Sequence, residues 1–240
     1  MIKRALVGSL AALFAFAVHA QSNEAAEVKK AIEATFGNGA KVDSVRDAGF
    51  LGLYEIQIGG DIFYTDKKAG YLLLGDVVET KSRKNLTEER KNRLAQIKFS
   101  DLPLDIAVKQ VRGNGKRVFA TFEDPNCGYC KKLAKEMQGM TDVTIYTFLY
   151  PILSPDSGDK SKAIWCSHDK AKAWNDWMIN GTEPAASGKC DAPTEKVVAL
   201  GRKLNIRGTP TIFFVDGSRV PGYIPAAQLE QTINRLGSGS

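Results

Sequence analysis

The chain has 240 residues, a formal net charge of +6 and four cysteines. A chain of this length suits one large domain or two smaller ones. Its lysines and arginines are spread along the sequence without a recognition motif, so we predict no nucleic-acid partner. Beyond the N-terminal segment, no stretch is long and apolar enough to cross a bilayer.

The N-terminus has the layout of an export signal. Met1–Arg4 is short and basic, Ala5–Val18 is apolar, and Val18–Ala20 supplies small residues where a signal peptidase cuts. The apolar stretch is too short for a membrane span and a polar segment follows it. A cleaved signal peptide over residues 1–20 is therefore favoured over an uncleaved anchor. An exported chain meets an oxidising environment in which disulfides persist.

Residues 21–80 are predicted to form a small N-terminal domain. Asn23 can cap a helix that runs to Phe36, because apolar residues recur there at helical spacing. Three strand patterns follow, separated by the turn signals Gly59–Asp61 and Asp66–Gly70. The predicted strands are Leu51–Ile58, Ile62–Thr65 and Tyr71–Val78.

The third of these strands begins with an apolar run, Tyr71–Leu74. A helix with a three-stranded meander has a thin core and leaves strand edges unpaired. This run is too apolar for a half-solvated edge, so either the neighbouring helix covers it or a second copy of the chain pairs with it. We favour the second copy, which predicts a homodimer joined through the N-terminal domain.

A charged segment over residues 81–101 follows. Asn85 and Glu88 fit a capping box, and the apolar positions after them are sparse. A mostly polar helix between two folded units acts as a semi-rigid spacer, so we predict a helical linker.

Residues 102–236 have the pattern of a second domain. Its elements follow the order β-α-β, then an insertion of helical character from Asp156 to Leu204, then β-β-α. This order is similar to the thioredoxin plan with an insertion, and the chain as a whole is predicted to be α+β / α/β. The predicted elements are strands Arg117–Phe122, Val143–Leu149, Thr211–Val215 and Arg219–Pro221, and helices Lys131–Gln138 and Pro225–Leu236.

The motif Cys127-Gly128-Tyr129-Cys130 lies between the first strand and the first helix of this domain. A helix N-terminus carries roughly half a positive charge and unpaired N–H groups, and both stabilise a thiolate. The thiolate is the reactive form of cysteine. The position therefore predicts Cys127 as the nucleophile, and Cys130, one turn further in, as the thiol that resolves a mixed disulfide.

Zinc binding is the other common use of a Cys-x-x-Cys pair, and it needs about four cysteine or histidine ligands. Outside the signal segment the remaining candidates are Cys166, Cys190 and His168, which form no second Cys-x-x-Cys. A strand followed by a helix favours the redox interpretation. We therefore predict no metal and no cofactor.

Cys166 and Cys190 lie in the helical insertion. A bond between them would close a loop of about 25 residues, worth roughly 3.5 kcal/mol on the loop-entropy estimate. Neither lies at a predicted helix start, so a structural disulfide is favoured over a second redox centre.

Together these features resemble the DsbC/DsbG family of the thioredoxin superfamily. The resemblance covers the mature length: a small N-terminal domain, a helical linker, and a thioredoxin-like domain with Cys-Gly-Tyr-Cys, a Thr-Pro pair and one further cysteine pair. Gly128 is typical of the DsbC branch, whereas the DsbG branch usually has proline there. The resemblance implies a periplasmic homodimer whose active sites face a cleft. It also implies that a membrane reductase of the DsbD type keeps the cysteine pair reduced.

The resemblance further implies that Thr209 and Pro210 form a cis-proline loop that packs against the cysteine pair. The Thr209 backbone would then pair with an extended substrate segment, and Gly128 and Tyr129 would belong to the same substrate-binding site. A trans proline that only starts the next strand is the alternative.

Relatives in the superfamily carry an acid six residues before the first active cysteine, where it assists proton transfer. Thr121 occupies that position here, and Glu123 and Asp124 are near it but out of register. The sequence therefore leaves the proton-transfer residue unidentified.

These features predict an enzyme, a thiol:disulfide isomerase and reductase that acts on mis-oxidised secreted proteins. Reduced Cys127 attacks a wrong disulfide, and the mixed disulfide is displaced by another substrate thiol or by Cys130. Two alternatives stay open. One is a narrow-specificity thiol reductase of the DsbG kind. The other is a chaperone-like dimer that binds misfolded clients.

Overall fold

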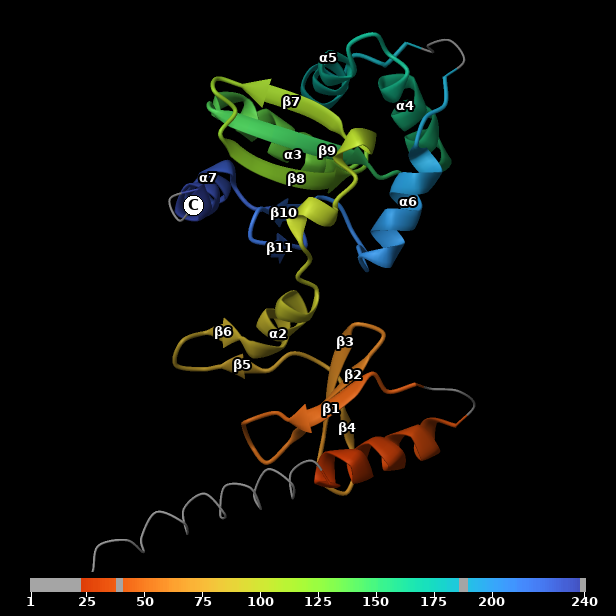
Figure 1. Ribbon diagram of the computed structural model, residues 1–240, viewed down its shortest axis with the longest axis vertical. Coiled ribbons are helices and arrows are strands. Elements are labelled where there is room, and N and C mark those ends of the chain that lie inside the picture. The colour runs from red at the N-terminus through yellow and green to blue at the C-terminus, as the bar shows by residue number, and fades with distance from the viewer. Residues whose placement is uncertain (1–22, 38–40, 186–189, 238–240) are drawn as a thin grey trace, which may run out of the picture. The chain divides into compact units, whose positions relative to one another are not determined.

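The computed structural model describes residues 23–37, 41–185 and 190–237 (Figure 1). The predicted signal peptide, residues 1–20, lies outside the described residues. The chain divides into two compact units, Met1–Leu94 and Ala95–Ser240. The finer division into 21–80, 81–101 and 102–236 remains a prediction.

The first unit packs the predicted helix, residues 23–36, on an antiparallel sheet in the order β1-β2-β3-β4. Val28 and Ile32 of the helix lie in one cluster with Val42, Tyr54 and Ile56. The strands are β1 (Ser44–Asp47), β2 (Tyr54–Ile58), β3 (Asp61–Thr65) and β4 (Leu72–Leu73). The first strand was not predicted, because its sequence Ser-Val-Arg-Asp is polar and half of it is exposed at the sheet edge.

The predicted third strand is much shorter than expected. Only Leu72–Leu73 pairs with β3, and the chain turns away at Gly75, whose φ is +139°. The chain then forms the hairpin of β5 (Val78–Glu79) and β6 (Lys84–Asn85). The apolar run nevertheless stays uncovered, since Tyr71 is 78% exposed and Leu74 is 74% exposed.

The linker helix is α2 (Leu86–Leu94), which is shorter than the charged segment that predicted it. Asn85 Oδ1 accepts the backbone N–H of Glu88 at 2.9 Å, as expected for a cap. One side of α2 contacts the rest of the first unit. The buried Thr87 hydroxyl lies 2.7 Å from the Tyr64 hydroxyl, and Arg90 binds Glu55 of β2. One side of the helix therefore packs on the rest of this unit, and its role as a linker remains a prediction.

The second unit is built on a five-stranded sheet in the order β11-β10-β8-β9-β7. Strands β8 and β9 run parallel and the other neighbours are antiparallel. The strands are β7 (Val108–Arg112), β8 (Arg117–Glu123), β9 (Val143–Leu149), β10 (Thr211–Phe214) and β11 (Arg219–Val220). The unpredicted strand β7 is an edge strand of mixed polarity, which hides its pattern in the sequence.

Helices cover both faces of this sheet (Figure 1). On one face, α3 and α7 pack on Phe119 and Ile145. On the other, α6 packs on Phe122 and Phe148. The predicted helical insertion is confirmed. The helical elements of this unit are α3 (Gly128–Glu136), α4 (Pro155–Trp165), α5 (Lys170–Asn175), the π-helical turn η4 (Asp176–Asn180), α6 (Thr194–Lys203), α7 (Ala226–Gly237) and the short turns η1 (Phe99–Asp101), η2 (Leu104–Ile106) and η3 (Met137–Gly139).

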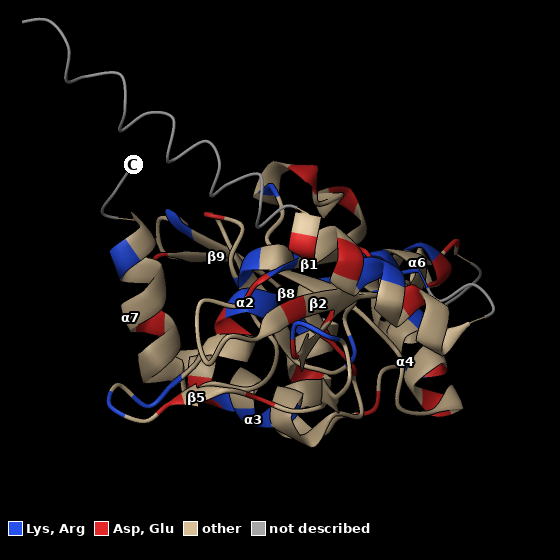
Figure 2. Cartoon of the chain, turned by 90° about the horizontal axis from the view of Figure 1, so that it is seen from below, with Lys and Arg blue, Asp and Glu red and all other residues tan. Residues whose placement is uncertain are grey.

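Basic and acidic residues are interspersed along helices of both units, such as α2 and α7 (Figure 2). Within the described part of the chain, no helix combines the length and the hydropathy that a membrane span requires.

Candidate active site

The two cysteines of the motif lie at the junction between strand β8 and helix α3. Cys127 is the N-cap of this helix, with extended backbone angles, and its Sγ accepts the backbone N–H of Cys130 at 3.2 Å. Its carbonyl accepts the N–H of Lys131 at 3.0 Å, which starts the helix. Cys127 is 5% exposed and Cys130 is fully buried, and neither is in a disulfide.

This placement separates the acidities of the two thiols. The interaction with Cys130 lowers the pKa of Cys127 to about 6, although burial acts in the opposite direction. Burial raises the pKa of Cys130, and its interaction with Cys127 adds to the rise. At neutral pH the pair is therefore a thiolate at Cys127 and a thiol at Cys130, the combination that thiol–disulfide exchange requires.

The four predicted substrate-binding residues lie around Cys127. The Thr209–Pro210 peptide bond is cis, and Cys127 Sγ lies 3.3 Å from the Thr209 carbonyl oxygen. Gly128 is exposed, with no atom within 4 Å of the position a Cβ would take, and Tyr129 is 64% exposed. The Tyr129 ring lies 5.8 Å from that of Tyr223. Open surface therefore adjoins the thiol.

A buried carboxylate shapes the loop before Cys127. Asp124 Oδ1 accepts the N–H of Asn126 at 2.8 Å and the Ser157 hydroxyl at 2.7 Å. Its Oδ2 accepts the N–H groups of Ile152 and Leu153 at 2.7 and 2.9 Å. Asp124 thus ties the active-site loop to the segment after β9 and to the start of α4. No spacing in the sequence indicated this role, because the partners are about thirty residues away.

Trp177 of η4 supports the same loop from the helical insertion. Its indole N–H donates to the Pro125 carbonyl at 2.6 Å. Lys131 Nζ lies 3.9 Å and Lys160 Nζ 4.8 Å from the centre of a Trp177 ring, within the range of cation–π attraction. The insertion therefore supports the active-site loop, a role that the sequence alone did not indicate.

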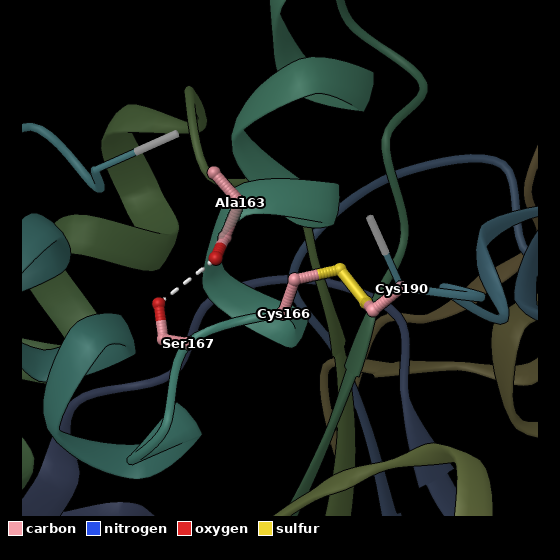
Figure 3. The surroundings of a disulfide bond; sticks show 4 residues. All are labelled: Ala163, Cys166, Ser167 and Cys190. Carbon is pink, nitrogen blue, oxygen red and sulfur yellow. Dashed lines mark hydrogen bonds between the residues drawn. A yellow bond between two sulfur atoms is a disulfide. The ribbon is translucent and has the colours of Figure 1, made fainter. Parts of the chain in front are cut away.

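The second cysteine pair is a disulfide in the structure (Figure 3). It joins Cys166, the C-cap of α4, to Cys190, with 5.7 Å between the Cα atoms. The adjacent Ser167 hydroxyl donates to the Ala163 carbonyl at 2.9 Å, which closes the last turn of α4. The bond ties the end of α4 to the segment that leads into α6. Among the described residues, no cluster of three or more His, Cys, Asp or Glu has the geometry of a metal site.

The acid position shows a further difference from the sequence-based expectation. Thr121 is buried there, but β8 continues to Glu123, so the period of two in a strand places Thr121 and Glu123 on the same sheet face. Glu123 is fully buried and neither of its carboxylate oxygens has a hydrogen-bond partner. Burial raises the pKa of Glu123 to about 8, and the negative charge of Cys127 adds to this rise.

The sheet order, the helix that starts at a Cys-x-x-Cys pair and the unequal thiol acidities define a thiol:disulfide oxidoreductase of the thioredoxin fold. Comparison with known families agrees: residues 104–237 match the family described as a thioredoxin-like domain, and residues 18–88 match the disulfide bond isomerase protein N-terminal domain.

Relatives narrow this class. The chain is 51% identical to a probable thiol:disulfide interchange protein DsbC of Bordetella parapertussis, over 80% of this chain and 68% of the relative. It is 28% identical to the thiol:disulfide interchange protein DsbC of Escherichia coli K12, over 92% of each chain. A solved disulfide interchange protein from Neisseria gonorrhoeae is 46% identical, covers 56% of this chain and 97% of its own, and gives a TM-score of 0.54. The chain belongs to the DsbC family, whose members join an N-terminal dimerisation domain to a thioredoxin-like domain.

Proposed function

We propose that this protein is a periplasmic isomerase and reductase that rearranges non-native disulfides of secreted proteins through a reduced Cys127-Gly128-Tyr129-Cys130 pair. The carrying observation is the position of Cys127 at the N-cap of α3, where its sulfur accepts the Cys130 amide at 3.2 Å. Family membership supports the reaction class, because the relatives are thiol:disulfide interchange proteins.

In the proposed mechanism, the Cys127 thiolate attacks one sulfur of a wrong disulfide in a client. The product is a mixed disulfide, and the second client sulfur leaves as a thiolate. If another client thiol then displaces Cys127, the client disulfide has been isomerised; if Cys130 displaces the client, the client disulfide has been reduced. The buried, weakly acidic Cys130 favours the first outcome when client thiols are close.

Client contact is assigned to Thr209, Pro210, Gly128 and Tyr129, which surround Cys127 and include open surface. Cys166–Cys190 is assigned a structural role, because it lies at the end of α4 away from any helix start. Its presence fits an oxidising compartment, and a membrane reductase of the DsbD type would return Cys127–Cys130 to the dithiol state.

The proposed assembly is a homodimer joined through the first unit. Strand β4 is an edge of its sheet, and three apolar side chains in it or next to it are exposed: Tyr71 at 78%, Leu73 at 46% and Leu74 at 74%. An exposed apolar edge strand favours pairing with another chain. The matched N-terminal family domain supports this assignment.

The function is tested by recovery of a mis-oxidised protein with several disulfides, incubated with reduced enzyme and no other oxidant. We expect recovery by the wild type, loss with Cys127→Ser, and accumulation of mixed disulfides with Cys130→Ala. Recovery that survives Cys127→Ala would instead support the chaperone-like alternative.

The assembly is tested by Leu74→Lys, which places a charge on a side chain already exposed in the single chain and so leaves the fold intact. The expected product is a folded monomer that still exchanges thiols but isomerises poorly. Val111→Lys is the matched control, since Val111 on β7 is 56% exposed in the other unit. Sedimentation of the wild type as a monomer at micromolar concentration would overturn the dimer.

A further inference from the structure

One buried acid in the second unit takes no part in the mechanism above. The Glu123 side chain is fully buried, and both of its carboxylate oxygens lack a hydrogen-bond partner. Burying a carboxyl group without partners destabilises a fold. Its position therefore calls for an explanation other than packing.

The sheet register places Glu123 below the active-site helix. Phe119, two pleat periods earlier on the same face of β8, packs on Leu133 of α3. Glu123 pairs in register with Leu149 of β9, and Leu149 lies in one packed cluster with Cys127 and Cys130. The carboxyl group is therefore on the face that α3 covers, at the strand end where this helix begins.

Among the described residues, the ionisable groups coupled to Glu123 are the two active-site cysteines. The charge of Cys127 raises the pKa of Glu123, and the charge of Glu123 raises the pKa of Cys130. The strand neighbours on its face are not ionisable: Thr147 and Leu149 come from β9. Asp124 follows in sequence, but its carboxylate accepts hydrogen bonds from the loop and from α4.

We propose that Glu123 is the proton acceptor for Cys130 when Cys130 attacks the mixed disulfide on Cys127. The inference rests on the proposed function and names a residue that supports it. In this step the Cys130 proton passes to the Glu123 carboxylate, and the Cys130 thiolate attacks Cys127 Sγ. The Cys127–Cys130 bond forms, the bond from Cys127 to the client breaks, and the client sulfur leaves as a thiolate with the electron pair. Over the two exchange steps together, the cysteine pair is oxidised by two electrons and the client disulfide is reduced by two.

The charge state of Cys127 determines when this proton transfer can occur. In the reduced protein Cys127 is a thiolate at neutral pH, and its charge helps to hold Glu123 protonated, with a pKa of about 8. When Cys127 enters the mixed disulfide its charge is lost, so the pKa of Glu123 falls and the carboxylate becomes more populated. The base therefore becomes available at the stage when Cys130 must lose its proton.

Two rates separate the proposal from its alternatives. Reduced protein is mixed rapidly with a peptide disulfide and quenched with acid, and mass spectrometry follows the mixed disulfide. Its formation reports on Cys127, and its decay reports on Cys130. For Glu123→Gln at pH 7 we expect unchanged formation and decay slowed about tenfold or more. Glu136→Gln, the same substitution at an exposed site of α3, should change neither rate.

The pH profile of decay distinguishes a proton acceptor from a merely structural residue. Wild-type decay should level off as Glu123 ionises, whereas the Glu123→Gln rate should keep rising with the ionisation of Cys130 itself. Unchanged decay in Glu123→Gln, or slower decay with an unaltered pH profile, would overturn the proposal. Decay that is equally fast in Cys130→Ala would instead overturn the proposed role of Cys130 and the function that depends on it.

A measurement on the wild type needs no variant at this site. The carboxyl band of buried Glu123 can be titrated by infrared spectroscopy in reduced protein and in protein methylated on Cys127 sulfur. Methylation removes the thiolate charge, so the midpoint should move to lower pH. An unmoved midpoint would contradict the coupling on which the proton transfer depends.

Discussion

Each unit of the protein buries one glutamate in a sheet, and the two are treated in opposite ways. Glu55 of β2 is 2% exposed and binds Arg46 Nε at 2.7 Å and Arg90 Nε at 2.9 Å. Burial acts to raise its pKa, but the two arginines outweigh burial and hold the pKa of Glu55 below its ordinary value. Glu123 of β8 has no such partner, and burial raises its pKa to about 8.

The difference shows that burial alone does not assign a role to a carboxyl group. The negative charge of Glu55 is balanced by two arginines, one from β1 and one from α2. The carboxylate therefore links both elements to β2. Glu123 is uncompensated and lies against the active-site helix, where a group that changes its protonation near neutral pH can move a proton. The first is a structural clamp and the second a candidate base.

The largest effect is expected from breaking the clamp with Arg90→Met. This change leaves buried Glu55 with only the partly exposed Arg46, and removing one partner of a buried pair costs about 3 kcal/mol. The loss should be present at pH 7. It should shrink as the pH falls below the ordinary glutamate value, because the folded-state pKa of Glu55 is lowered and its contribution disappears as the group protonates.

The measurement must report on the first unit. All three tryptophans, Trp165, Trp174 and Trp177, lie in the second unit, so hydrogen exchange of the β2 amides is suited to the first. Arg93→Met is the control, since Arg93 on the same helix makes only an exposed pair with Glu89 at 3.9 Å. Equal destabilisation by Arg90→Met and Arg93→Met would show that Glu55 needs no clamp.

Glu123→Gln should change the stability of the protein in the opposite direction and increase it. The folded-state pKa of Glu123 lies above the unfolded value of 4.5, so the folded protein binds more protons and stability falls as pH rises between 4.5 and about 8. Glutamine does not titrate, so the variant has no such loss of stability as the pH rises. The variant should match the wild type near pH 4 and exceed it by a margin that grows as the pH rises to about 8.

Denaturant unfolding followed by tryptophan fluorescence reports on this unit. The lowered pKa of Cys127 works in the other direction, adding stability as pH rises from about 6. The difference between variant and wild type cancels that contribution, because both carry Cys127. A difference that does not grow with pH would mean that Glu123 is compensated after all.

The third prediction concerns the group to which Glu123 responds. Alkylation of Cys127 in the reduced protein should reach half its plateau rate near pH 6, where it should be about tenfold faster than that of an ordinary thiol. Glu123→Gln should leave this midpoint in place, because Glu123 is still protonated at pH 6 and carries no charge. A midpoint that moves by a full unit would show that Glu123 is ionised there. Preferential labelling of Cys130 would reverse the assignment of the two thiols.

Sequence predicted the parts of the site that depend on neighbours in the chain. The Cys127 cap needs only a strand, a turn and a helix in succession, and the motif displays all three. The Asp124 network could not be predicted, because Ile152, Leu153 and Ser157 reach it only through the fold. Edge strands β1 and β7 were missed because their hydropathy does not follow burial. Strand β1 is polar and half exposed, and in β7 the polar Gln110 is buried whereas the apolar Val111 is exposed.

Glu123 illustrates how one residue at an element boundary changes an interpretation. A strand predicted to end at Phe122 leaves the next residue without an assigned face, whereas β8 continues through Glu123 and fixes its direction. Strand ends are the least certain part of any sequence-based assignment. The orientation of the acid, and with it the candidate proton acceptor, therefore became visible only in the folded sheet.

The smallest effect is expected from a change next to Glu123. Thr121 lies on the same face of β8, and its hydroxyl partly counteracts the rise in the Glu123 pKa without forming a hydrogen bond of normal geometry. Thr121→Val keeps the shape and removes this dipole, so the midpoint of the Glu123 carboxyl band should move upward. Thr147→Val is the matched control, because Thr147 pairs in register with Thr121 on the neighbouring strand and its replacement leaves the Thr121 dipole in place. A downward shift in Thr121→Val would show that the hydroxyl favours the protonated acid, and the Glu123 carboxylate would then be even scarcer when Cys130 must lose its proton.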